Sequence, residues 1–116
     1  MGQLCNVNPP PIGDLEEVSI TVDTTKVKTG TIHCYKWGHV VQVYFFNVTF
    51  YNNGNNQILA TGLPSCAVQQ AIVFSNELIS RDDSVWISGG GGTSLLANIN
   101  SKDVAHFNGM VYLSTE

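Results

Sequence analysis

Apolar and polar residues alternate along most of this chain with a period of two residues. Residues 18–23 show the pattern most simply, because every second residue there is an aliphatic, β-branched side chain (Val18, Ile20, Val22). A period of two is typical of a strand with one dry and one wet face. Similar segments rich in strand formers follow at 26–35, 38–51, 58–64, 66–75, 83–88, 94–99 and 110–115.

From residue 58 onward, each of these segments is short and is bounded by Gly, Pro, Asn, Asp or Ser. Seven or eight strands at this spacing favour an antiparallel sandwich or barrel. We predict an all-β fold, an antiparallel β-sandwich of the jelly-roll kind. Residues 14–19 have room for at most one helical turn.

The longest strand pattern, residues 38–51, has apolar residues at most of its even positions and at the odd positions of its first half. We expect both faces to be buried at the start, one face to reach solvent later, and a bulge near 45–47. Before it, Gly38 fits the positive φ angle of a tight hairpin turn. Trp37 and His39 then flank this turn at one end of the domain.

The first residues differ from the rest. Pro9, Pro10 and Pro11 favour an extended path and exclude a central strand or a helix. Residues 1–16 are therefore interpreted as a proline-rich lead-in, and 17–116 as one folded head domain. Residues 51–57, rich in Asn and Gly, are expected to form a loop.

The composition favours a neutral partner. Of the 116 residues, 43% are hydrophobic and only 12% are charged. Asn, Ser and Thr, at 11, 9 and 9 copies, make up a quarter of the chain. Such a surface is hydrated by amides and hydroxyls, which suits sugars better than polyanions. The net charge of −4 and five scattered basic residues argue against nucleic acid. We expect neither a membrane helix nor a signal peptide, because no apolar segment of the required length is present in the sequence.

Few residues suggest chemistry. Cys5, Cys34 and Cys66 lack zinc-site spacing and are interpreted as free thiols. The glycine run at 89–92 lacks the lysine of a phosphate loop. No nucleophile elbow or carboxylate pair stands out, so we expect neither an enzyme nor a metal or other cofactor.

The most sugar-like set is Arg81, Asp82, Asp83 and Trp86, because charged groups bond to hydroxyls and an aromatic face stacks on a sugar ring. With Trp37 and His39 they are the candidate ligand contacts. The alternative, a turn at Asp82–Asp83 and a core position for Trp86, stays open.

Several short motifs carry a resemblance to a known family. Gly30 in an early strand, the hairpin "KWGHVVQVYF" (36–45), "LATGLPSC" (59–66) with its Leu63–Pro64 turn, and the terminal "FNGMVYLS" (107–114) occur in this order. Together they resemble the C-terminal β-domain of bacteriophage tail fibres and baseplate receptor-binding proteins, over about residues 18–115.

This resemblance implies a homotrimeric β-sandwich head at the end of a fibre, on the virion tail, after synthesis in the bacterial cytoplasm. It also implies contact with other tail or baseplate proteins and adhesion to a host cell-wall saccharide. The first hypothesis is therefore a non-enzymatic receptor-binding domain. The second is a structural trimerisation or attachment module without a ligand, and the third is a fragment of a polysaccharide depolymerase.

Overall fold

The computed structural model describes residues 15–67, 72–75, 83–88, 92–105 and 107–116. These residues contain strands and no helix, and so no helix able to cross a membrane. The chain is therefore all-β, as the alternating pattern predicts. The strands are β1 (Glu16–Val18), β2 (Thr21–Val22), β3 (Val27–Trp37), β4 (Val40–Phe50), β5 (Gly54–Thr61), β6 (Ile72–Ser75), β7 (Ser84–Ile87), β8 (Leu95–Ile99) and β9 (Phe107–Leu113).

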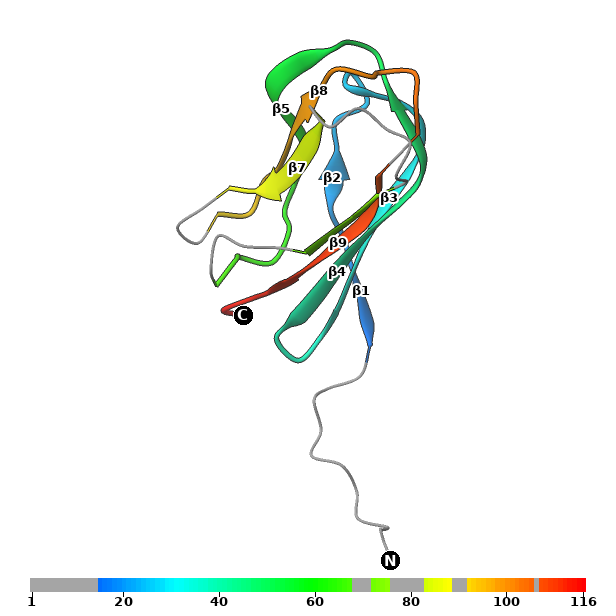
Figure 1. Ribbon diagram of the computed structural model, residues 1–116. Coiled ribbons are helices and arrows are strands. Elements are labelled where there is room, and N and C mark those ends of the chain that lie inside the picture. Colours follow the sequence, from blue (N-terminus) through cyan, green and yellow to red (C-terminus); the bar gives the residue numbers. More distant parts are fainter. Residues whose placement is uncertain (1–14, 68–71, 76–82, 89–91, 106) are drawn as a thin grey trace, which may run out of the picture.

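The strands form two antiparallel sheets, which make two layers in Figure 1. The five-stranded sheet has the order β1-β3-β4-β9-β6, and the four-stranded sheet has the order β2-β5-β8-β7. Between β1 and β2 the chain crosses from one sheet to the other at Ser19 and Ile20. This arrangement is sandwich-like, which confirms the predicted architecture at that level.

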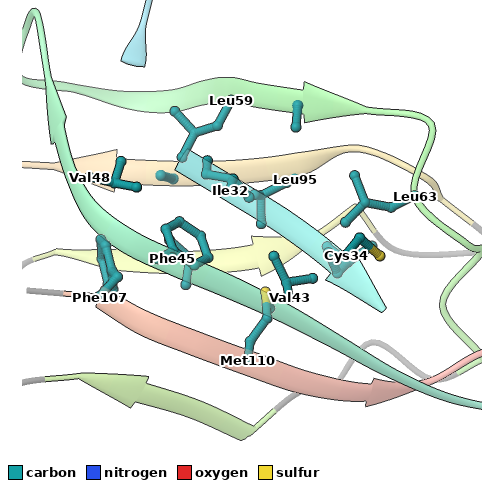
Figure 2. Close-up of a cluster of buried hydrophobic side chains, with 14 of the residues drawn as sticks. Ile32, Cys34, Val43, Phe45, Val48, Leu59, Leu63, Leu95, Phe107 and Met110 are labelled. Carbon is teal, nitrogen blue, oxygen red and sulfur yellow. The ribbon is translucent and has the colours of Figure 1, made fainter. Parts of the chain in front are cut away.

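The core lies between the inner faces of the two sheets. Leu59 and Leu95 come from the four-stranded sheet and meet Val43, Phe45 and Met110 of the five-stranded sheet (Figure 2). All five are nearly or fully inaccessible to solvent. Burying one such side chain contributes about 1.5–3 kcal/mol, so apolar packing holds the layers together.

β4 changes the parity of its buried residues halfway along. From Val41 to Phe45 the odd positions are buried, whereas beyond Asn47 the buried residues are Val48 and Phe50. One extra residue in the strand causes this shift, because successive side chains point to opposite faces. The bulge predicted near 45–47 is thus confirmed.

The bulge depends on two residues with left-handed backbone. Asn47 has a φ of 52°, and Gly30, which lies across from it on β3, has a φ of 82°. The β3–β4 register shifts between Thr29 and Thr31 at the same place. A Cβ atom at residue 30 would collide with the carbonyl oxygens of Phe46 and Asn47. Glycine at this position is therefore a steric requirement of the bulge.

The prediction that both faces of β4 are buried at its start is wrong for this chain. Tyr44 and Phe46 are 39% and 50% exposed, and Val40 is only half-buried. The sandwich covers the inner face alone, so apolar residues at even positions up to 46 remain on the outside.

Three local predictions had different outcomes. Gly38 has a φ of 61°, which confirms the hairpin turn. The loop at 51–57 is shorter than expected, because β5 already begins at Gly54. The buried Gln57 side chain donates from Nε2 to the carbonyl of Asn52 at 3.0 Å and so orders this segment. Residues 16–18 form β1 instead of a helical turn, because they pair with β3.

The side chains of Cys34 and Cys66 are both buried, that of Cys34 as a free thiol, as expected, and Cys5 lies outside the described residues. Burial raises the pKa of Cys34 to about 11, so this thiol is a core group and not a nucleophile. Nearby, Tyr112 donates its hydroxyl to the Pro64 carbonyl at 2.6 Å. Burial, followed by the two cysteines, raises the pKa of Tyr112, so the phenol stays protonated as a donor.

Candidate functional site

Trp86 lies on the outer face of the four-stranded sheet. Its neighbours Val85 and Ile87 point into the core, so Trp86 points outward and is half-buried. It pairs with Leu96 of β8, which in turn pairs with Ile58 of β5. These three residues form the outer row, a line of apolar side chains across β7, β8 and β5. Ile58 is 47% exposed, so the far end of this row is open to solvent.

Neutral polar residues border the outer row. Ser84 and Asn98 pair on the next rung, and Asn98 Oδ1 accepts a hydrogen bond from the Asn56 amide at 2.8 Å. On the other side, the Ser88 hydroxyl accepts from the Ser94 amide at 3.2 Å. An apolar strip between amides and hydroxyls can take the C–H face of a sugar ring while its hydroxyls bond to the flanks.

Asp83 lies beside this surface, at the start of β7, but its carboxylate is engaged in the fold. Its two oxygens accept the backbone amides of Asn100 at 2.5 Å and Ser101 at 3.3 Å. It therefore fixes the segment that follows β8. Arg81 and Asp82 lie outside the described residues.

Trp37 and His39 lie on the other sheet. Trp37 ends β3 and is half-buried, opposite Val40. The His39 ring lies with Nδ1 3.0 Å from the Ser114 carbonyl, so Nδ1–H donates there, while the His39 carbonyl accepts from the Ser114 amide at 2.7 Å. These bonds attach the β3–β4 turn to the segment after β9. The structure therefore does not bring the predicted contacts into one site, because Trp37 and Trp86 lie on different sheets.

The outer face of the five-stranded sheet carries a second surface, which the sequence analysis missed. Aromatic side chains lie side by side on it: Tyr44 and Phe46 have ring centroids 6.1 Å apart, and His33 and Tyr35 are stacked at 6.3 Å. We call this surface the aromatic face; its members are Tyr35, Trp37, Val40, Tyr44, Phe46, Val111 and Leu113. The apolar even positions of 40–46 are the available signal, but by their pattern alone they look like core positions.

A groove runs along the β3 side of the five-stranded sheet, between β3 and the edge of the other sheet. Its volume is about 420 Å³. Apolar side chains from both sheets line it (Val22, Val27, Ile32), together with Lys28 and Tyr51. A second hollow of about 330 Å³ adjoins it at Ile32 and His33 and extends to Glu17. There His33 Nδ1 lies 3.0 Å from Glu17 Oε2.

Among the described residues, no three His, Cys, Asp or Glu side chains gather as metal ligands would. The outer row, the aromatic face and the groove are open surfaces that carry aromatic, amide and hydroxyl groups. Groups of this kind suit ligand binding. Comparison of the chain with protein-family models, with curated proteins and with solved structures gives no match.

Proposed function

We propose that this chain is a non-enzymatic adhesion domain that binds a saccharide through the outer row. The observation that carries the proposal is the position of Trp86, which lies with Leu96 and Ile58 on an open sheet face between Asn98 and the serine hydroxyls. A neutral sugar needs a flat apolar contact and bonding partners that do not demand charge. The low charge of the chain supports the same class of ligand.

The motif resemblance gives this activity a setting. We propose a receptor-binding head of a phage tail, with a jelly-roll-like sandwich assembled as a homotrimer, that attaches to a host cell-wall saccharide. Single sugar contacts are weak, and three copies on one fibre raise the avidity by bringing the second and third sites to high effective concentration.

The test uses an array of bacterial cell-wall saccharides, probed with the purified protein. Trp86→Ala is expected to weaken binding about three- to tenfold per site, since aromatic stacking contributes ~0.5–1.5 kcal/mol beyond buried area. Trp37→Ala is the matched control, because it removes the other tryptophan from a different sheet. Thermal unfolding of both variants checks the fold. If Trp86→Ala binds as the parent does and Trp37→Ala loses binding, the outer row is the wrong site.

The aromatic face favours a second function, a structural trimerisation module. Exposed apolar patches of this kind are typical of surfaces covered by a partner. Light scattering after size exclusion distinguishes the two. The structural module would be supported by two results together. The parent protein would be a trimer that recognises no saccharide on the array, and the double substitution Tyr44→Asp, Phe46→Asp would convert it to a monomer. Saccharide binding that depends on Trp86 would support adhesion.

A further inference from the structure

The edge of β3 beside the groove is open over half of the strand. β1 pairs with β3 only at Cys34, Tyr35 and Lys36. After Val18 the chain leaves this edge and crosses to the other sheet. Over residues 27–33 of β3, no strand in the described part of the chain pairs on the side away from β4. Backbone amide and carbonyl groups along such an edge can template another strand.

The groove lies along this same open edge. An added strand would lie beside β3 and antiparallel to it, next to the end of β1. It would occupy the edge of β3 that the chain leaves at Ser19. Its inward side chains would meet Val22, Val27 and Ile32, which come from both sheets. The residues of the added strand that lie between these inward ones would point outward, in the same way that Glu17 of β1 points toward His33. The edge thus offers backbone bonds and alternate apolar contacts together.

The charges around the groove indicate which charge a bound peptide should carry. Lys28 is exposed and lines the groove, and no carboxylate belongs to that lining. A lysine at an edge deters pairing with apolar or basic segments, and the bulge at Gly30 limits a long regular ladder. We propose that the open edge of β3 binds a short, extended, acidic peptide segment as an added strand, with apolar residues at alternate positions.

This inference does not depend on the outer row, since Trp86 lies on the other sheet. Peptide binding is therefore expected to be unchanged in Trp86→Ala. A failure of the saccharide proposal would leave it intact, and the reverse is also true.

The experiment uses three capped hexapeptides with the full 116-residue chain. In one, valine and glutamate alternate; in the second, valine and lysine alternate; the third is the valine–glutamate peptide with N-methyl groups on alternate amides. We expect the first to shift the amide resonances of residues 28–33 and to slow their hydrogen exchange. The valine–lysine peptide is expected to bind about two- to fivefold more weakly, the range for one exposed ion pair. N-methylation removes the ladder donors and is expected to abolish binding.

A charge exchange provides the decisive control. Lys28→Glu changes an exposed side chain and is expected to reverse the preference, so that the valine–lysine peptide binds better. Equal binding of the N-methylated peptide would overturn the proposal, because the ladder would then contribute nothing. So would perturbations confined to the β6 or β7 edges, or a saccharide that occupies the groove while the peptides leave residues 28–33 unchanged.

Discussion

On the outer face of the four-stranded sheet, apolar side chains occupy the single row of Trp86, Leu96 and Ile58, with polar rungs beside it. On the outer face of the five-stranded sheet they spread over β3, β4 and β9 as the aromatic face. The inner faces of the two sheets, in contrast, share one core, to which the described four-stranded sheet contributes aliphatic side chains and the five-stranded sheet contributes both aliphatic and aromatic ones.

The difference separates the residues that hold the fold together from those that we propose to bind a partner. A narrow apolar strip between amides and hydroxyls fits a small, partly polar ligand. A broad aromatic surface fits a large partner. Substitution of residues on either surface is expected to change the stability of the fold little, because these residues lie outside the shared core. The experiments below test this separation, beginning with the largest expected effect.

The largest contrast is expected between adjacent leucines of β8. Leu95 is fully buried in the core, whereas Leu96 lies in the outer row. Leu95→Ala is expected to lower the free energy of unfolding by about 2–5 kcal/mol through lost burial and the cavity left behind. Leu96→Ala is expected to cost less than about 1 kcal/mol. Urea unfolding of both variants measures the difference, and equal or reversed losses would mean that the register of β8 is off by one residue.

The period-two pattern was enough to predict the fold class and several strands, but not which apolar face is internal. Tyr44 and Phe46 alternate as core residues do, and only the position of the second sheet shows that they lie outside. The bulge at Asn47 was predictable because the odd positions stop being apolar after Phe45 while the even positions stay apolar up to Phe50. The start of β5 at Gly54 was not, because it depends on the pairing of Gly54 with Ile99 of β8, a tertiary feature.

The candidate contacts were predictable only singly. Trp86 was recognisable by residue type, and its partner Ile58, 28 positions away, became visible through the β5–β8–β7 pairing. The groove was invisible in the sequence, since it depends on where β1 leaves β3. Charged residues near a tryptophan suggested ligand contacts, yet Asp83 is engaged with the amides of Asn100 and Ser101.

The next test compares Gly30 of β3 with Gly62, which follows the end of β5. Gly30 and Gly62 both have left-handed φ angles, 82° and 84°. A Cβ atom added to residue 62 would meet no steric clash, since the nearest atom, the Ser19 carbonyl oxygen, would lie 3.8 Å away. Gly62→Ala is therefore expected to cost about 1–2 kcal/mol from backbone strain alone. Gly30→Ala is expected to cost a further ~1–3 kcal/mol, because its Cβ also collides with the carbonyls across the bulge. Chemical denaturation compares the two, and similar losses would argue against a tight bulge.

The smallest effect is expected in the turn from β2 to β3, which joins the two sheets. Asp23 Oδ1 accepts from the Thr25 hydroxyl at 2.6 Å and from the Thr25 amide at 2.9 Å. These bonds, the hydroxyl first, hold the pKa of Asp23 below its usual 3.8. A lowered folded-state pKa means that the charge stabilises the fold above the unfolded-state pKa, and that this contribution is lost as pH falls through the folded-state value. Asp23→Asn is thus expected to be slightly less stable than the parent at neutral pH and equally stable well below pH 3.8.

Thr25→Val separates the charge of Asp23 from the turn itself. Without the hydroxyl, the largest cause of the lowered pKa is gone, so the pH-dependent stability gap that Asp23→Asn opens is expected to shrink in the Thr25→Val background. Urea unfolding of the parent, the two single variants and the double variant at neutral and acid pH measures this gap. A gap of unchanged size in that background would assign the stabilisation to the groups that remain there, the Thr25 backbone amide and Lys26.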